Sequence, residues 1–254
     1  MYKKYKVARK IKESDLVFSL YLQPADSSTL TPFLPGQHLM FKFNLPGNDI
    51  SLFRYFSFSD SFNEKYYRVS VKKEGGPCSS YIFDHLNEGD IVEAKDPQGN
   101  FVLDIDADNP VALFAGGIGI TPLLCMIKTV SLKNPSRRIS LFYGVNDNTH
   151  HAFKKELHEL KTNYPSLEVV TFYKNISDQD IKGVNYDHHG LIDLALLHPD
   201  FRNATTGFYI CGPAIMMEFI SNGLKNAGID EKNIHTESFV SSIPGEEIID
   251  TPKS

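Results

Sequence analysis

Cysteine is scarce in this chain of 254 residues. Only three cysteines occur, they lie far apart, and none belongs to a C-x-x-C pair: Cys78, Cys125 and Cys211. An odd number without paired spacing argues against a disulfide framework and favours a reducing, cytoplasmic location. An iron–sulfur cluster normally takes four cysteine ligands, so the chain cannot supply a four-cysteine cluster by itself.

Long apolar runs and an excess of positive charge are also missing. No run approaches the roughly 20 apolar residues that a membrane-spanning helix needs. The basic segment Met1–Val7 is not followed by the apolar stretch of a secretory signal. With a net charge of −5, the chain carries no electrostatic footprint for nucleic acid. We therefore expect neither a membrane span nor a nucleic-acid partner.

The nine histidines offer no clear metal-binding set. His150, His151, His188, His189 and His198 fall in expected loops and are interpreted as solvated polar residues. We expect no metal site.

The chain is long enough for two domains, and its pattern changes near the acidic stretch Asp104–Pro110. Before it, short strands predict an antiparallel barrel or sandwich with one helix. The expected strands are Met40–Phe43, Tyr66–Lys72 and Ile91–Ala94, and the expected helix is Ser80–Leu86. After it, strands and helices alternate, which predicts a parallel sheet. Here the expected elements are strands Val111–Ala115, Arg138–Tyr143, Leu167–Tyr173 and Gly207–Cys211, and helices Ala152–Asn163 and Ala214–Ala227.

The stretch Val111–Met126 combines a buried strand, a glycine-rich turn and the start of a helix. Gly116, Gly117 and Gly119 leave room for a ligand to approach the backbone, while Thr121 is expected to cap the helix and Pro122 to lie in its first turn. Free N–H groups and the helix dipole would then favour a phosphate. The spacing is not G-x-G-x-x-G, so glycines alone leave a plain tight turn equally open.

Several separate motifs, in the right order, resemble the ferredoxin–NADP reductase family. Arg54–Ser57 resembles its flavin motif R-x-[YF]-[ST], and Lys73–Ser80 resembles its G-x-x-S pyrophosphate motif. Gly116–Pro122 resembles its nicotinamide-nucleotide loop, Phe208–Pro213 its C-G-P motif, and His235–Phe239 its C-terminal end. The stretches 97–101 and 186–193 look most like the reductase half of flavohaemoglobins, without the globin half.

The resemblance implies an antiparallel flavin-binding β-barrel (1–106) followed by a parallel-sheet nucleotide-binding α/β domain (107–240), with 241–254 as a tail or linker. FAD and NAD(P)H are the implied cofactors. Ser57 would hold flavin N5, Cys211 would lie beside nicotinamide C4, and Glu237 and Phe239 would lie at the flavin edge and face. The cofactor-binding residues it implies are Arg54, Tyr55, Phe56, Ser57, Phe58, Ser59, Val71, Gly76, Pro77, Cys78, Ser79, Ser80, Gly116, Gly117, Gly119, Thr121, Pro122, Cys211, Gly212, Pro213 and Phe239.

The activity implied is an FAD-dependent NAD(P)H reductase that passes electrons to a ferredoxin, an oxygenase component or a haem protein. A non-catalytic flavin-bearing electron-transfer or redox-sensing subunit is the alternative. A flavin-free binding module on the same fold is a third. Reaction with free NADH separates the first two, and a visible spectrum tests the third.

A preference for NADH over NADPH is expected from the loop after Tyr143. A 2′-phosphate needs a nearby cation, whereas Asp147 suits a free 2′-hydroxyl and Lys174 is the only nearby cation expected on the next strand. The catalytic efficiencies with NADH and with NADPH measure this preference. A higher catalytic efficiency with NADPH than with NADH would refute it.

Overall fold

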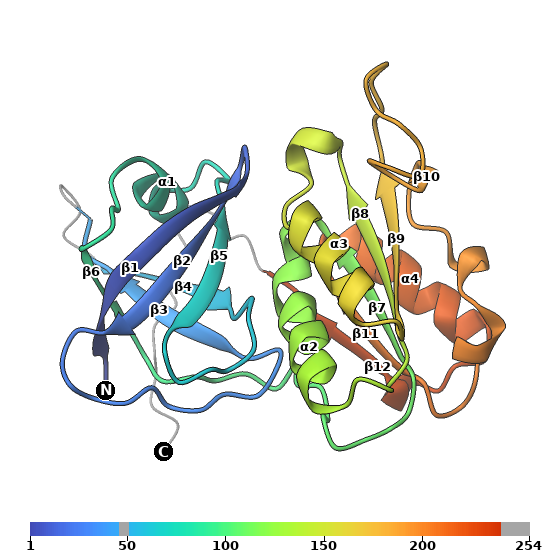
Figure 1. Ribbon diagram of the computed structural model, residues 1–254, viewed down its shortest axis with the longest axis horizontal. Helices are drawn as coiled ribbons and strands as arrows, with labels where there is room; N and C mark the ends of the chain where they lie inside the picture. Colours follow the sequence, from blue (N-terminus) through green and yellow to red (C-terminus); the bar gives the residue numbers. More distant parts are fainter. Residues whose placement is uncertain (46–50, 240–254) are drawn as a thin grey trace.

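The computed structural model describes residues 1–45 and 51–239. They form two units that lie side by side, a β-barrel and an α/β domain (Figure 1). The expected tail 241–254 lies outside the described residues. No described helix is both long and apolar enough to cross a membrane.

The first unit is a six-stranded antiparallel sheet with the strand order β4-β3-β6-β1-β2-β5. An isolated bridge between Phe58 and Val69 joins its two ends, which confirms the predicted barrel over a sandwich. Its strands are β1 (Lys3–Ser14), β2 (Val17–Pro24), β3 (His38–Phe43), β4 (Leu52–Ser57), β5 (Tyr67–Lys72) and β6 (Ile91–Ala94).

The two longest strands of the barrel, β1 and β2, were not singled out by the sequence pattern. Along β1 the side chains of Tyr5 and Val7 are buried, but six lysines and arginines surround them in the sequence. The inward alternation is therefore obscured by charge, although it still sets the register of the hairpin.

The helix of the barrel, α1 (Pro77–Asp84), begins three residues before the expected Ser80 and ends two before Leu86. Gly76 is its N-cap and Pro77 occupies the first turn, where a missing N–H costs nothing. Ser80, the expected first residue of the helix, therefore lies inside it instead. The buried side chains of Cys78 and Ile82 join the barrel core, so α1 covers one end of the barrel (Figure 1).

The second unit is a parallel sheet with the strand order β10-β9-β8-β7-β11-β12. This confirms the predicted α/β class. Its strands are β7 (Val111–Gly116), β8 (Ile139–Val145), β9 (Leu167–Tyr173), β10 (His188–His189), β11 (Gly207–Cys211) and β12 (Ile234–Glu237). Its α-helices are α2 (Ile120–Lys133), α3 (Lys154–Asn163) and α4 (Ala214–Asn226). Five 3₁₀ turns complete it: η1 (Gly117–Gly119), η2 (Asn148–His150), η3 (Leu194–Leu196), η4 (Pro199–Phe201) and η5 (Glu231–Asn233).

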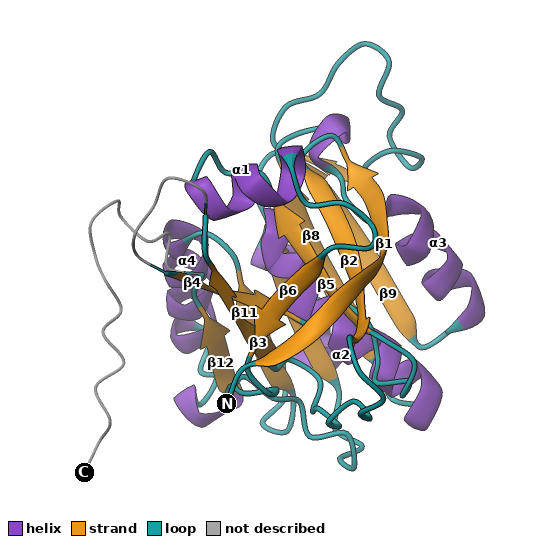
Figure 2. Ribbon diagram, turned by 90° about the vertical axis from the view of Figure 1, so that its left-hand side faces the viewer, coloured by secondary structure: helices purple, strands orange, loops and turns teal. Residues whose placement is uncertain are grey.

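Helices cover both faces of this sheet, with α3 and α4 on opposite sides (Figure 2). Successive residues of β7 accordingly enter two different cores: Leu113 packs with α2 and α3, and Phe114 packs with α4. Burial on both faces explains why β7 is apolar throughout rather than alternating.

The order of the strands reverses between β7 and β11. From β7 the chain proceeds through β8 to β9 on one side, and β11 and β12 continue the sheet on the other side. In open α/β sheets ligands bind outside the carboxyl ends of the strands at such a reversal. The residues at that point are Gly116 and the segment that follows Cys211.

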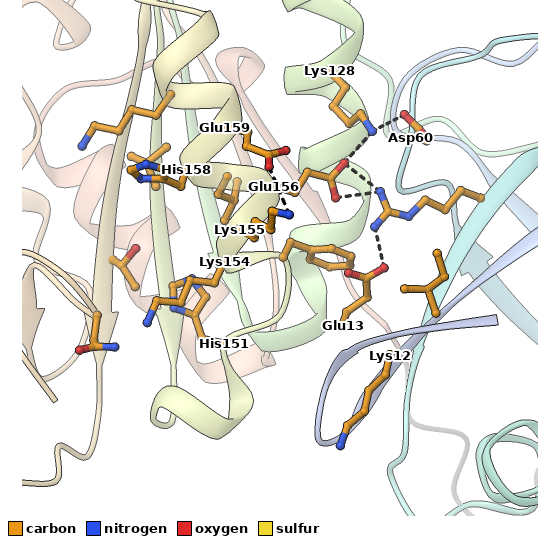
Figure 3. A pocket seen from close by; sticks show the side chains of 18 of the residues that line it. Lys12, Glu13, Asp60, Lys128, His151, Lys154, Lys155, Glu156, His158 and Glu159 are labelled. Carbon is orange, nitrogen blue, oxygen red and sulfur yellow. Dashed lines mark hydrogen bonds and ion pairs between the residues drawn. The ribbon is translucent and has the colours of Figure 1, made fainter. Parts of the chain in front are cut away.

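A network of buried charges joins the two units. Arg68 on β5, with a side chain 3% exposed, contacts Glu13 at 2.8 Å and Glu156 on α3 at 2.8 Å. Lys128 on α2 lies between Asp60, at 2.5 Å, and Glu156, at 2.6 Å (Figure 3). Burial opposes the charged form of Arg68, but the carboxylates of Glu156 and Glu13 outweigh it and raise its pKa. The network therefore holds α2 and α3 against the barrel.

The substitution Arg68→Met is expected to lower the free energy of unfolding by about 3–5 kcal/mol, because it leaves the largely buried Glu13 carboxylate without its cation and Glu156 with Lys128 alone. Urea denaturation followed by circular dichroism measures the loss. The matched control is Arg138→Met, whose pair with Asp200 is exposed and is expected to contribute less than about 1 kcal/mol. Equal losses in the two variants would contradict the structural role of the network.

Candidate functional site

The glycine-rich turn after β7 packs directly against the end of β11. A Cβ on Gly119 would lie 2.2 Å from the carbonyl oxygen of Cys211, so no other residue fits there without moving the backbone. Gly117 has φ +53°, and nothing lies within 4 Å of the position its Cβ would take. One glycine therefore permits close packing, while the other leaves an open space.

The start of α2 differs from the expectation in one respect. Gly119 is the N-cap, and the Thr121 hydroxyl donates instead to the carbonyl oxygen of Ile118 at 3.0 Å. The expected capping role of Thr121 is therefore wrong, although Pro122 does lie in the first turn.

Two cavities adjoin this turn. We call the first, of about 470 Å³, the barrel cavity; it is lined by Arg54, Tyr55, Phe56, Ser57, Ser70, Val71, Lys72, Glu74, Gly76, Cys78, Ser79, Ile118, Thr121 and Phe239. We call the second, of about 560 Å³, the switch-point cavity; it includes Gly116, Gly117, Tyr143, Asn146, His150, Lys174, Leu191, Pro213, Ile215 and Phe219. Lys72 and Ile118 line both cavities. The two cavities therefore adjoin, with residues from both domains in their walls.

Ser57 places an unsatisfied hydroxyl in the barrel cavity. The residue is 2% exposed, and its Oγ has no hydrogen-bond partner among the described residues. A buried polar atom left unpaired costs roughly 1–3 kcal/mol. The position therefore suits a ligand that supplies the missing partner.

Arg54 gives the same cavity an available cation. One guanidinium nitrogen donates to the carbonyl oxygen of Phe53 at 2.6 Å, but no carboxylate pairs with Arg54 in the described part of the chain. Its charge acts on the nearby Cys78 thiol, whose pKa burial raises and Arg54 lowers in part. Arg54 thus lies next to the first turn of α1.

The N-terminus of α1 faces the barrel cavity without a side-chain cap. Its N-cap is Gly76, which has no side chain, and the hydroxyl of Ser79 donates back to the carbonyl oxygen of Gly76 at 3.0 Å. The first-turn N–H groups and the Arg54 guanidinium together form a site suited to phosphate oxygens.

A group of side chains not lining either cavity lies where β3, β11 and β12 meet. Cys211 pairs with Glu237 in the parallel ladder, and burial together with the Glu237 carboxylate raises the pKa of its thiol well above the ordinary value. Oε2 of Glu237 is buried without a described partner, and Oε1 lies 3.6 Å from Nδ1 of His38. His38 was not among the predicted residues. It follows the turn Pro35–Gln37 and pairs with Ser57 across the β3–β4 ladder, so only the strand pairing reveals it.

Several sequence-predicted residues face elsewhere. The ring of Phe58 stacks on Phe33 at 3.7 Å, and the Ser59 hydroxyl lies 2.7 Å from that of Ser70. The predicted residues that line neither cavity are Phe58, Ser59, Pro77, Ser80, Gly119, Pro122, Cys211, Gly212 and Glu237. Of these, Gly119 and Cys211 support the site through the backbone contact described above.

Asp147 is occupied within its own turn. Its Oδ1 accepts hydrogen bonds from the backbone and hydroxyl of Thr149 and lies 2.7 Å from Nδ1 of His150. Asp147 does not line the switch-point cavity, whereas His150 and Lys174 do. The acid expected to select a free 2′-hydroxyl therefore does not itself line the cavity, although its partner His150 does.

Three histidines expected in solvated loops lie elsewhere, because His188 and His189 form strand β10 and His151 is buried. His151 is 7% exposed, its Nδ1 lies 2.8 Å from the hydroxyl of Tyr173, and burial lowers its pKa to about 4. It is therefore a neutral core residue near pH 7. Within the described residues no group of three or more metal-ligating side chains is present.

A larger cavity, of about 1130 Å³, lies elsewhere, along α3 and the charge network between the domains (Figure 3). None of the predicted site residues lines it, and its most buried charges, such as Arg68 and Lys128, are paired with carboxylates. Size alone therefore does not identify the functional site.

Comparison with known proteins assigns both units. The model described as "Oxidoreductase FAD-binding domain" matches residues 4–103, and "Oxidoreductase NAD-binding domain" matches residues 113–222. The chain is 34% identical over 244 residues to a flavohemoprotein of Bacillus cereus, covering 94% of this chain and 61% of the relative. It thus spans about three fifths of the length of this relative.

Solved structures of similar proteins support the same assignment of both domains. The flavohem-like FAD/NAD-binding domain of a nitric oxide dioxygenase from Vibrio cholerae is 29% identical, with a TM-score of 0.85 over 93% of this chain and 98% of that one. Phthalate dioxygenase reductase is 25% identical, with a TM-score of 0.73 over 95% of this chain and 69% of that one. The chain therefore belongs to the FAD- and NAD-binding oxidoreductases of the ferredoxin–NADP reductase type, and matches the reductase part of the flavohemoproteins.

Proposed function

We propose that the barrel cavity holds FAD, that the switch-point cavity admits NAD(P)H, and that the chain passes electrons onward to a separate carrier protein in the cytoplasm. The observation that supports this most is the sharing of Lys72 and Ile118 by the two cavities. Two ligands bound there would meet without leaving the protein, which favours transfer between them.

The residues present fit FAD. Arg54 and the uncapped turn of α1 suit its pyrophosphate, and the unsatisfied Ser57 hydroxyl suits a polar edge of its ring system. When bound, FAD supplies the redox chemistry: it accepts a hydride from NAD(P)H and can release electrons singly.

The chain's own contribution is to bind, orient and shield. Ser57 lines the barrel side of the site. On the α/β domain, Cys211 packs against Gly119 and keeps its thiol neutral. Phe239 lines the barrel cavity and would have to move aside for a second ring to enter. Tyr55, at 41% exposed, lies at the solvent side of the cavity, where a carrier protein can approach.

The carrier is proposed by chemical class. Among the similar structures, phthalate dioxygenase reductase passes electrons from pyridine nucleotides to [2Fe-2S], and the curated relatives are flavohemoproteins. We therefore propose an iron–sulfur or haem protein. Anaerobic mixing of the flavin-loaded protein with NADH, followed by a carrier of each kind, tests the assignment. A protein whose flavin stays oxidised with both NADH and NADPH would be a non-catalytic subunit instead.

Substitution of Arg54 by alanine is expected to weaken FAD binding about ten- to a hundredfold. One charge-assisted hydrogen bond contributes roughly 1.5–3 kcal/mol, and each 1.4 kcal/mol is about tenfold in affinity. Titration of the apoprotein with FAD measures the change. The control is Arg9→Ala, because Arg9 lies on the same domain outside both cavities, with its guanidinium over the Tyr21 ring. Unchanged affinity in Arg54→Ala would remove Arg54 from the site.

Ser57→Ala and Cys211→Ala are each expected to slow flavin reduction by NADH about tenfold while FAD stays bound. A tenfold loss equals about 1.4 kcal/mol of transition-state stabilisation. Anaerobic stopped-flow absorbance measures the rate in a single turnover. Cys125→Ala serves as control, because its thiol is equally buried but packs in the barrel core, whereas Cys211 lies beside Glu237 at the end of β11. Wild-type rates in both test variants would defeat the proposed geometry.

A further inference from the structure

The tip of the β1–β2 hairpin belongs to the barrel but forms part of the switch-point cavity. Ser14, Leu16 and Val17 line that cavity, whose other walls come mainly from the α/β domain. Val17 is 4% exposed and packs in the same core cluster as Val145 and Ala152 of the α/β domain. The hairpin tip therefore packs across the boundary between the two domains.

Two backbone hydrogen bonds connect the tip to its surroundings. The N–H of Lys73 donates to the carbonyl oxygen of Leu16 at 2.8 Å, within the barrel. The N–H of Asp15 donates to the carbonyl oxygen of Thr149 at 3.4 Å, across the boundary to η2, where His150 also lines the switch-point cavity. The second bond is long, since N–H···O bonds usually measure about 2.7–3.2 Å. It therefore holds the tip against η2 only weakly.

An irregularity in the hairpin directs the side chain of Glu13 toward the charge network. The register of β1 and β2 shifts between Lys12 and Ser14, so Glu13 has no partner across the ladder. Such bulges re-aim a side chain. Oε1 of Glu13 lies 2.8 Å from Nη2 of Arg68, and the two side chains are only 13% and 3% exposed (Figure 3). The residue directly before the tip is therefore tied to a buried cation.

The α/β domain holds that same cation, because Nη1 of Arg68 lies 2.8 Å from the carboxylate of Glu156 on α3. Glu13 itself does not line the switch-point cavity, whereas the next residue does. Any effect of Glu13 on a ligand in the cavity must therefore pass through the position of the hairpin tip.

We propose that Glu13 is a positioning residue for nucleotide binding, an inference that rests on the proposed entry of NAD(P)H into the switch-point cavity. Its ion pair with Arg68 holds Ser14 and Leu16 in place as the barrel's part of the cavity wall. A nucleotide that enters then meets a wall that is already formed, so binding does not have to order the tip.

Nucleotide affinity and reduction rate, measured separately, test this role. The FAD-loaded protein is titrated with NAD+ and with NADP+ by calorimetry, and its flavin is reduced by saturating NADH or NADPH in an anaerobic stopped-flow instrument. Wild type is compared with Glu13→Gln, Leu16→Ala and the double variant. The matched control is Asp60→Asn, which breaks another ion pair of the same network, that with Lys128, without involving the hairpin.

Glu13→Gln and Leu16→Ala are each expected to raise the Kd of the nucleotide about fivefold or more, with FAD affinity and the limiting rate of reduction unchanged. The double variant is expected to bind no more weakly than the weaker single variant, because both changes act through the tip. Asp60→Asn is expected to lower the melting temperature without changing the Kd. Glu13→Asp keeps the charge on a shorter side chain, so its Kd should fall between those of wild type and Glu13→Gln.

A wild-type Kd in Glu13→Gln, or equal losses of affinity in Glu13→Gln and Asp60→Asn, would overturn the positioning role. If Glu13→Gln does not fold, Glu13→Asp takes its place in the same comparison. A wild-type protein that binds no FAD, or neither NAD+ nor NADP+, would instead overturn the proposed function, and this inference with it.

Discussion

The position of the site depends on one backbone contact, the approach of Gly119 to the carbonyl group of Cys211. This contact packs the turn after β7 directly against the end of β11. The two segments that follow these strands at the strand reversal are therefore in contact with each other. It also fixes η1 and the start of α2, from which Ile118 and Thr121, respectively, reach the barrel cavity. A side chain at position 119 would displace both the turn and the helix, and with them one wall of the barrel cavity.

Charged groups in the cleft along α3 and polar groups near the barrel cavity differ in how they are paired. In the cleft along α3, Arg68 and Lys128 are held by carboxylates from both domains, so those charges are satisfied within the protein. Around the barrel cavity, Ser57 and Glu237 retain buried oxygens without described partners. Paired charges hold the domains together, whereas unpaired groups are suited to bind something else. We therefore propose that the two smaller cavities, rather than the one along α3, carry the function.

Much of the fold followed from periodicity and from glycine and proline positions. β6, β9 and β11 have the predicted bounds, because each is a short apolar or β-branched run. The hairpin of β1 and β2 was not predicted from the sequence, and in β1 the inward residues Tyr5 and Val7 stand among lysines and arginines. α1 was misplaced because its start depends on Pro77 and on an N-cap that has no side chain.

The site was predictable where residues adjoin in sequence and less so where pairing brings them together. Arg54 and Ser57 line the barrel cavity, as motif resemblance implied, but Phe58 enters the core and the Ser59 hydroxyl bonds to that of Ser70. His38 is 199 positions from Glu237, and nothing in the local sequence of either residue signals the contact. Cross-domain contacts of this kind require the register of both sheets.

The most direct measurement is a crystal structure of the protein with FAD bound. We predict FAD in the barrel cavity, with its pyrophosphate within hydrogen-bond distance of Arg54 and its ring system between Ser57 and Phe239. FAD located in the cleft along α3, or at any position outside the barrel cavity, would contradict it.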